Sequence, residues 1–356
     1  MYSRKMLQVP ARLINNGKPV FGTFYGPVAR LDIRGLRSPF GKVPLPALIS
    51  NFRIKSTLSF CFNVGQYTGD VIFFDGKIFG LAEVVFWDRN TGRKYAYKTI
   101  MGPRRRFIPH NLQQGFCASF GRRRYIRISW DHKRDRISMI FNLSGDSVRP
   151  SVQAALTGHY SDSTMCEVTQ CVPFKSKRRC SASYLSTPSL RGSLTIGKTK
   201  KTPGTTVETE SGPGLFYINR SYMDYLTKTQ FINAAGTADG KQVAFFIANL
   251  VESGADEELI NRNMLIVDGQ ATPLPPVKMT QPFGLNGKWI IQDTENMVDL
   301  TFESESDHYR HMSFIVSKIE MHILYGKFEG VIKTKDGQDI KISGFAGFAR
   351  DQLLRV

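Results

Sequence analysis

The chain has 356 residues, a length that indicates two packed cores rather than one. Of these residues 41% are hydrophobic and 12% aromatic, a composition that excludes a disordered protein. No apolar run approaches the length of about 18 residues that a membrane-spanning helix needs. The net charge of +18 is unevenly placed, since residues 1–180 contain 30 Lys and Arg against 10 Asp and Glu, whereas residues 181–356 contain 18 against 20. The basic half favours an anionic partner, unless its charge serves solubility alone.

The N-terminal segment lacks acidic residues before Asp32, as a mitochondrial presequence does, but Pro10 interrupts it and a secretory apolar region is missing. We therefore expect a cytoplasmic protein, with a mitochondrial location as the alternative. The cysteines are odd in number and include no C-x-x-C pair, so we expect buried free thiols in a reducing compartment rather than disulfides or zinc ligands. They are Cys61, Cys117, Cys166, Cys171 and Cys180.

Strand signals dominate the chain. In residues 124–130 the side chains of Ile126, Ile128 and Trp130 share one face, because successive side chains of a strand point to opposite sides. Asn-Gly or Asp-Gly pairs, which tolerate the positive φ of tight hairpins, separate such runs. They occur at residues 16–17, 75–76, 239–240, 268–269, 286–287 and 336–337. The pattern predicts an all-β protein built from antiparallel barrel or sandwich modules.

Residues 104–136 interleave arginines with aromatic side chains, among them Phe116, Phe120 and Trp130. This combination is typical of single-stranded nucleic-acid binding, and its charge also suits an anionic membrane surface. The interpretation that we favour is a set of strands with inward aromatic side chains and solvated arginines. The candidate residues for binding an anionic surface are Arg104, Arg105, Arg106, Arg122, Arg123, Arg124 and Arg127.

A stretch rich in Ser, Thr, Lys and Gly at residues 175–205 suggests a boundary between two modules, 1–185 and 186–356. Further along, His308 and His311 would face opposite sides of a strand, so they predict no metal site. The chain has no G-x-S-x-G turn and no complete glycine-rich phosphate loop. We therefore expect no cofactor.

Several segments of the chain, taken in the order in which they occur, resemble the tandem lipocalin-like family known as domain of unknown function 2804. The segment NFRIKS (residues 51–56) is similar to an F-R-x-K signature, and FWDRNTGRKYAY (residues 86–97) to a D-x-x-T-G hairpin. The densest match is NRNMLIVDGQATPLPPVKM (residues 261–279), followed by the closing strands at residues 325–356. The resemblance implies two lipocalin-like modules, as in the carotenoid hydratase (hydroxyneurosporene synthase) relatives, which hold an apolar molecule between or within the modules.

The chain departs from this pattern where the family carries acidic residues. Arg262 lies where the family has an acid between two asparagines, and Arg350 lies where its last strand has Glu. Since an arginine cannot act as a general acid or base near neutral pH, these exchanges favour a non-catalytic binding protein for a lipid-like or isoprenoid-like molecule. From the resemblance, the candidate ligand-binding residues are Phe216, Tyr217, Tyr222, Phe231, Asn261, Arg262, Asn263 and Arg350.

Two alternatives stay open at this point. One is a cofactor-independent hydratase or cyclase acting on an apolar substrate, with catalytic residues unknown. The other is a basic protein associated with nucleic acid or with an assembly. A buried carboxylate or histidine facing an open cavity would favour the enzyme over the binding protein.

Overall fold

The computed structural model describes residues 2, 4–41, 45–103, 107–199, 204–249, 260–314 and 317–355. These residues form β-strands almost throughout, and the one helix among them is α1 (Ala47–Phe52). The predicted all-β class is therefore confirmed. No helix in the described part of the chain has the length and the hydropathy needed to cross a membrane.

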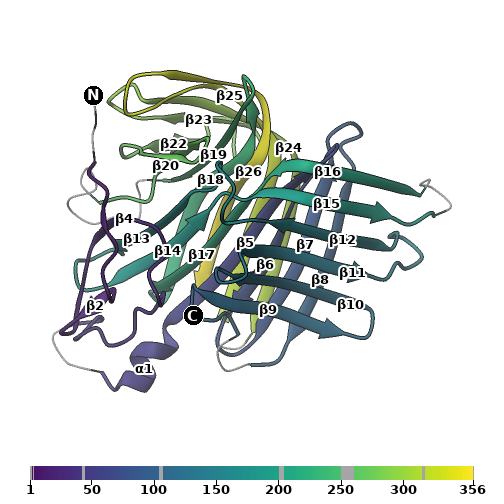
Figure 1. Cartoon of the computed structure of the whole chain (residues 1–356). Coiled ribbons are helices and arrows are strands. Elements are labelled where there is room, and N and C mark those ends of the chain that lie inside the picture. Colours follow the sequence, from purple (N-terminus) through teal and green to yellow (C-terminus); the bar gives the residue numbers. More distant parts are fainter. Residues whose placement is uncertain are drawn as a thin grey trace.

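The N-terminal part of the chain is a sandwich of two sheets (Figure 1). The first sheet has the order β1 (Leu7–Gln8), β4 (Gly22–Tyr25), β13 (Glu167–Pro173), β14 (Cys180–Ser186), β17 (Leu215–Tyr222), β5 (Ile54–Val64), β6 (Tyr67–Asp75), β7 (Gly80–Asp88) and β8 (Lys94–Met101). The second has the order β16 (Thr205–Pro213), β15 (Ser189–Ile196), β12 (Val152–Gly158), β11 (Arg136–Leu143), β10 (Arg124–Asp131) and β9 (Gln114–Gly121). A small hairpin joins β2 (Ile14–Asn15) to β3 (Lys18–Pro19).

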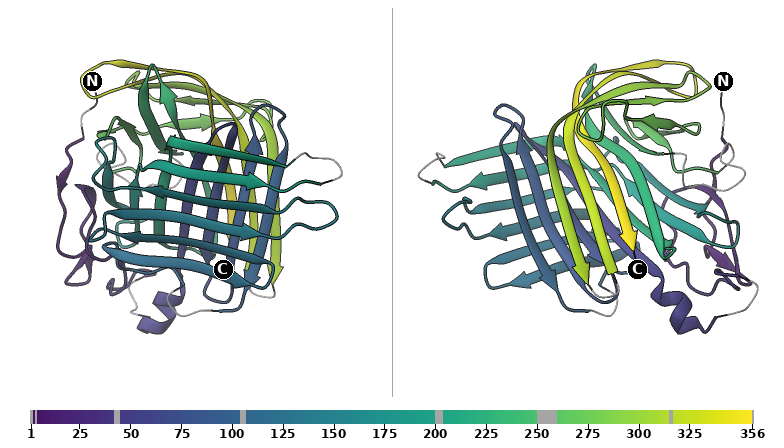
Figure 2. Two further views of the ribbon diagram at one scale, coloured as in Figure 1. Left: turned by 45° about the vertical axis from the view of Figure 1, so that its right-hand side comes forward. Right: turned by 180° about the vertical axis from the view of Figure 1, so that it is seen from behind.

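The C-terminal part is one curved sheet that packs against the first sheet. Its order is β21 (Gln270–Pro273), β20 (Met264–Val267), β19 (Lys241–Ala248), β18 (Leu226–Ala238), β26 (Asp339–Arg355), β25 (Ser317–Lys333), β24 (Val298–Phe314), β23 (Lys288–Gln292) and β22 (Lys278–Thr280). The right-hand view of Figure 2 shows its long green and yellow strands running alongside the blue strands of the first sheet. The first sheet is thus covered on both faces.

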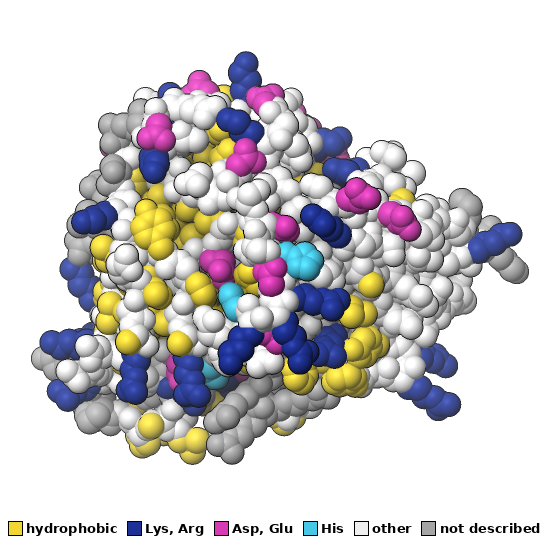
Figure 3. All heavy atoms as spheres, in the orientation of Figure 1, with side chains coloured by type: hydrophobic (Ala, Val, Ile, Leu, Met, Phe, Trp, Pro, Cys, Tyr) yellow, Lys and Arg dark blue, Asp and Glu magenta, His cyan; other side chains and the backbone are white. Residues whose placement is uncertain are grey.

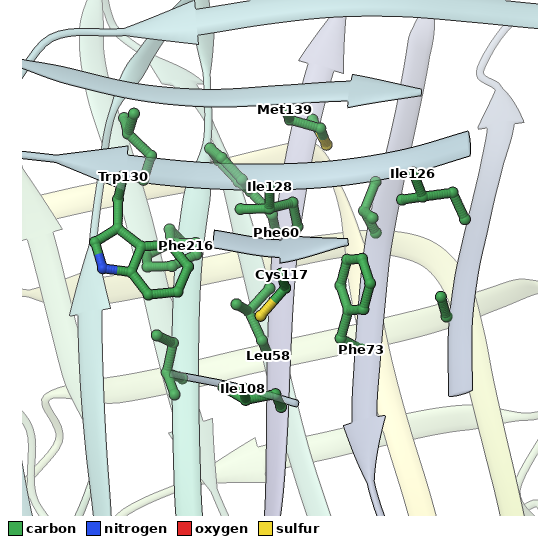
Figure 4. Close-up of a cluster of buried hydrophobic side chains, with 14 of the residues drawn as sticks. Leu58, Phe60, Phe73, Ile108, Cys117, Ile126, Ile128, Trp130, Met139 and Phe216 are labelled. Carbon is green, nitrogen blue, oxygen red and sulfur yellow. The ribbon is translucent and has the colours of Figure 1, made fainter. Parts of the chain in front are cut away.

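Alternation of apolar side chains builds the core of the sandwich. Ile126, Ile128 and Trp130 of β10 are all buried, whereas Arg127 between them is exposed, which confirms the predicted strand and its inner face. Figure 4 shows these side chains packed against Phe60 and other residues of the first sheet. The core is therefore filled by side chains from both sheets.

Tight turns occur at three of the predicted Asn-Gly and Asp-Gly pairs. Asn16 and Gly17 both have positive φ, at 50° and 77°, as a type I′ hairpin requires. The pairs at residues 239–240 and 268–269 have the same geometry and join β18 to β19 and β20 to β21. The hairpin prediction is confirmed at these places.

The expected boundary at residues 185 and 186 falls inside β14, which pairs with β17. Strands up to Tyr222 belong to the first two sheets, and the third sheet begins at Leu226, so sheet membership changes between these two residues. The polar composition that suggested a boundary at residues 185 and 186 belongs partly to β16. This is an edge strand whose side chains mostly alternate between exposed and half-buried. Such an edge strand has the composition of a linker without being one.

The three longest strands join the two parts of the molecule. In β24–β26, Phe302, Phe328 and Phe345 pack inside the third sheet, whereas Tyr325 and Phe348 pack against the first sheet. Register shifts between residues 304 and 306 and between residues 328 and 330 lie where the strands pass from one core to the other. Such bulges increase the twist of a strand, so that one strand can place side chains in the core inside the third sheet and in the core between the first and third sheets.

Candidate functional site

The module interface, between the first and third sheets, holds buried ion pairs. Arg350 pairs with Asp70, and Ser59 donates a hydrogen bond of 2.9 Å to the same carboxylate. Both members of the pair are at most 1% exposed. The charge reversal at Arg350 is therefore compensated across the interface, and this side chain holds the two modules together.

A second buried group lies beside that pair. Arg310 pairs with Glu83, and Nε2 of His308 lies 3.0 Å from Oε1 of Glu83. Burial lowers the pKa of His308 to about 4, so the imidazole is neutral at pH 7 and its Nε2–H donates a hydrogen bond to the carboxylate. His311 lies on the opposite face of the same strand and is exposed.

The module interface is filled by aromatic side chains. Trp87 stacks on Tyr325 with ring centroids 5.1 Å apart, and Tyr217 stacks on Phe246 at 4.6 Å. Two cavities between the modules measure about 20 and 10 Å³, room for about one water molecule at most. Neither of these cavities has room for a ligand. Of the two places that the resemblance implied, between or within the modules, the first is therefore closed at these two points.

The candidate ligand-binding residues divide between two places. Phe216 and Tyr222 lie in the core of the N-terminal sandwich, and the Tyr222 hydroxyl donates to the Ile33 carbonyl at 3.0 Å. Tyr217, Phe231, Arg262 and Arg350 meet at the module interface, where the Arg350 guanidinium lies 5.2 Å from the centre of the Phe231 ring. There Arg262 donates to the Tyr217 hydroxyl at 3.4 Å.

Asn261 and Asn263 hold the chain before β20. The backbone N–H of Asn263 donates to Oδ1 of Asn261 at 2.9 Å. The Asn263 side chain accepts a hydrogen bond from the backbone N–H of Ala248 and donates one to the carbonyl oxygen of Pro275. Both side chains are buried. Their contacts fix this loop against its neighbours.

An open cleft lies at the end of the N-terminal sandwich, beside α1. Its two parts have volumes of about 370 and 490 Å³, and Asp32, Arg34 and His110 border both. Apolar side chains of α1 and of the sandwich line the first part, with Phe52 and Ile108 among them. The cleft therefore combines an apolar wall with a group of charged side chains.

Arg220 of β17 lies at the base of the cleft and is 1% exposed. Its guanidinium donates to Oγ of Ser56 at 2.9 Å and to the carbonyl oxygens of Ile108 and Pro109 at 2.8 Å each. Within the described residues no carboxylate lies within ion-pairing distance of it. Burial lowers the pKa of Arg220 to about 10, so it stays charged at neutral pH.

His110 lies between the two parts of the cleft. Its Nδ1 lies 3.6 Å from Oδ1 of Asp32. Burial, and then the charge of Arg220, lower the pKa of His110 to about 4, so the imidazole is neutral at pH 7. Burial raises the pKa of Asp32, but hydrogen bonds from Arg34 outweigh that effect and set it below its usual value. The pair can accept a hydrogen bond from a ligand.

A second buried cation lies near this cleft. Nζ of Lys55 donates to the carbonyl oxygens of Phe52 and Gly76, at 3.2 and 2.9 Å. Burial lowers the pKa of Lys55 to about 8. The nearby Asp75 pairs with Lys77 at 2.8 Å. Cations thus exceed acids around the cleft.

The predicted basic segment is only partly an exposed arginine surface. Arg122, Arg123 and Arg127 are exposed, whereas Arg124 is half-buried and donates to the Lys98 carbonyl oxygen. Arg104, Arg105 and Arg106 lie outside the described residues.

The favoured interpretation of inward aromatic side chains was wrong for β9. Phe116 and Phe120 are 53% and 63% exposed, because Cys117 between them takes the inward position. Phe116 lies under the Arg127 guanidinium at 5.2 Å. Both phenylalanines border the second part of the cleft.

Arg220 and His110 were not among the residues predicted from the sequence. The signal for Arg220 was present, since Phe216, Ile218 and Tyr222 share its face of β17 and are all buried. An arginine at that position had to point into the sandwich. No comparable signal marks His110, because it lies in an irregular segment between β8 and β9.

A family model confirms the resemblance found in the sequence. Residues 4–355 match a family model described as "Domain of unknown function (DUF2804)". Among solved structures, kievitone hydratase from Nectria haematococca is 8% identical, with a TM-score of 0.44, over 85% of this chain and 88% of that one. An AttH-type protein from Nitrosomonas europaea is 13% identical, with a TM-score of 0.42, over 88% and 97%. No curated protein matches the sequence.

Proposed function

The chain belongs to the DUF2804 family, and from the geometry of its cleft we propose that it binds an amphipathic small molecule with an anionic head group. The head group lies against Arg220, and the apolar part lies along the wall formed by α1 and the sandwich. This proposal keeps the expected binding of an apolar molecule without a cofactor. It places the site within the N-terminal module, at the end of the sandwich, rather than between the modules.

Arg220 is the observation that carries the proposal. Removing a charge from water costs several kcal/mol unless a counter-charge or hydrogen bonds compensate, so buried arginines in proteins are usually paired. Arg220 is hydrogen-bonded to neutral acceptors, and the nearby Asp32 and Asp75 are already paired with Arg34 and Lys77. A carboxylate, sulfate or phosphate group entering the cleft supplies the missing negative charge.

The remaining lining suits the apolar part of such a ligand. Leu48 and Phe52 of α1 and Ile54 and Ile108 of the sandwich border the same part of the cleft as Arg220. Binding sites for small molecules commonly have a volume of about 300–1,000 Å³, mostly apolar walls and a few polar groups. The volume of about 370 Å³ falls within that range.

Two fluorescent molecules test the proposal. Anilinonaphthalene sulfonate joins an apolar ring system to an anionic group, and phenylnaphthylamine has the same rings without the charge. We expect both to bind the wild type. Arg220→Met should weaken the sulfonate about 10- to 100-fold, which corresponds to the loss of one charged hydrogen bond, and leave the neutral molecule unchanged.

Controls separate loss of the site from loss of the fold. Arg220→Lys keeps the charge and should retain most of the sulfonate affinity, and phenylnaphthylamine binding reports an intact apolar wall. If a folded Arg220→Met protein binds the sulfonate as tightly as the wild type, the proposal is wrong.

His110 supports a second candidate, a cofactor-independent hydratase. A histidine facing an open cleft was the feature that would favour an enzyme, and His110 is neutral and close to Asp32. Its imidazole would take a proton from a water molecule whose oxygen bonds to the β-carbon of an enone, and the α-carbon would take up a proton as the double bond is lost. A base with a pKa of about 4 is weak at neutral pH, however, so we place binding first.

The second candidate has its own test. Benzylideneacetone is an apolar enone, and its hydration removes the conjugated absorbance. Turnover by the wild type that disappears in His110→Gln would support the enzyme. Binding of the enone without turnover would leave the binding protein as the function.

A further inference from the structure

Helix α1 exposes its apolar side chains and buries a polar one. Leu48, Ile49 and Phe52 are 84%, 51% and 46% exposed, and the buried residue of the helix is Ser50. The arrangement is the reverse of the usual amphipathic surface helix, which turns its apolar face to the core. The hydrophobic effect therefore favours transfer of these side chains from water to an apolar partner.

The exposed apolar surface continues around the opening of the cleft. Leu45 precedes α1 and is 42% exposed, and Ile78, in the turn between β6 and β7, is 38% exposed. On the other side of the cleft lie the exposed rings of Phe116 and Phe120. Single exposed apolar residues are common, but a group bordering one opening marks an interaction surface.

Basic side chains accompany this surface. Arg30 and Arg34 are exposed at the second part of the cleft, and Lys77 borders the first. Figure 3 shows yellow hydrophobic side chains interleaved with dark blue Lys and Arg along the lower edge of the molecule, where Figure 1 places α1. Arg34 and Lys77 pair with the acids of the cleft, Asp32 and Asp75. The excess of positive charge therefore comes from Arg30 and from the buried Arg220 and Lys55. The surface is thus apolar and positively charged.

We propose that the opening of the cleft docks on an anionic lipid bilayer, with α1 lying at the level of the head groups. Apolar side chains of such a helix enter the boundary of the acyl chains, while each nearby Lys or Arg contributes about 1 kcal/mol of attraction to anionic lipid. In this orientation the cleft faces the membrane. The inference does not depend on which ligand the cleft takes.

The chemistry of α1 favours lipid over nucleic acid as the partner. Single-stranded nucleic acid is bound by aromatic rings on which bases stack, and Phe116 and Phe120 are such rings. The two most exposed side chains of α1, Leu48 and Ile49, are aliphatic and offer no stacking surface. They are also among the most exposed apolar residues of the N-terminal sandwich. Aliphatic side chains at this exposure gain most from transfer into acyl chains.

Sedimentation with vesicles tests this inference. The full chain is mixed with vesicles of phosphatidylcholine alone or of phosphatidylcholine with phosphatidylserine, at low and at high salt. We expect binding to the phosphatidylserine vesicles that weakens with salt. The double variant Leu48→Glu and Ile49→Glu should bind them at least about tenfold more weakly, because it places two negative charges against the anionic lipid.

The matched control is Phe283→Glu. Phe283 is 78% exposed and lies between β22 and β23, which Figure 1 draws at the opposite end of the molecule from α1. This variant should bind vesicles as the wild type does. In a Leu48→Trp variant, the indole fluorescence should shift to shorter wavelength when vesicles are added.

Several outcomes would overturn the inference. The first is wild-type protein that binds neither kind of vesicle. The second is a double variant that binds phosphatidylserine vesicles as tightly as the wild type does. The third is a Leu48→Trp variant that binds vesicles without a shift of its indole fluorescence. Binding to single-stranded polyuridylate in place of vesicles would identify nucleic acid as the partner. A urea-denaturation midpoint equal to that of the wild type shows that the double variant is folded.

Discussion

The module interface and the cleft both bury arginines, but they compensate the charge differently. At the interface Arg350 meets Asp70 and Arg310 meets Glu83, and aromatic side chains fill the space around them. At the base of the cleft Arg220 has neutral acceptors, and the space beside it is open. The arginines of the first region have carboxylate partners within the chain, whereas we propose that an anion supplies the partner in the second.

From this difference we infer which buried arginine serves binding. Burial and pKa alone do not separate the regions, since burial lowers the pKa of Arg310 to about 9 and that of Arg220 to about 10. The presence of a carboxylate partner and of open space does separate them. Arg350 therefore joins the two modules through its pair with Asp70, and we propose Arg220 as the residue that meets the ligand.

The largest effect is expected from breaking the interface pair. Arg350→Met should lower the free energy of unfolding by about 3–5 kcal/mol, because it leaves Asp70 buried without its partner. Urea denaturation measures this change. The double variant Asp70→Leu with Arg350→Met should recover most of the loss, and equal losses from the single and double variants would contradict a paired structural role.

A smaller effect on stability is expected at the cleft. Arg220→Met leaves no carboxylate unpaired, and water in the cleft can replace the guanidinium at the Pro109 carbonyl. We therefore expect a loss of about 1–2 kcal/mol by urea denaturation, less than for Arg350→Met. A larger loss than at Arg350 would reverse the assignment of the two arginines.

The smallest effect concerns acid stability. The pKa of His110 is lowered in the folded chain to about 4, whereas in the unfolded chain it is about 6.5. The unfolded chain therefore takes up a proton first as the pH falls. The contribution of neutral His110 to the free energy of unfolding is complete above about pH 6.5 and is lost as the pH falls toward 4. His110→Gln removes the proton that His110 takes up on unfolding. The stability difference between wild type and variant should therefore shift against the wild type between pH 7 and pH 5, and a constant difference would show that His110 titrates normally.

The sequence predicted local structure better than it predicted the site. Alternation identified the inner face of β10, and three Asn-Gly or Asp-Gly pairs identified hairpins, because both patterns depend on neighbouring residues. Helix α1 was not predicted, since its six residues are largely apolar and no side chain caps its N-terminus. Its exposed apolar face also contradicts the usual rule for surface helices.

The site depends on residues that meet only in the folded chain. Asp70 lies 280 positions from its partner Arg350, so the arginine looked like the loss of an acid rather than half of an ion pair. The cleft likewise joins Asp32, His110 and Arg220 from separate segments. Only the alternation of β17 could have placed Arg220 inside the sandwich.

A crystal structure of the protein with dodecanoate tests the central claim most directly. The account predicts the carboxylate within hydrogen-bonding distance of the Arg220 guanidinium and the alkyl chain along Leu48 and Phe52 of α1. Dodecanoate bound between the two modules, or bound elsewhere while the base of the cleft holds only water, would contradict it.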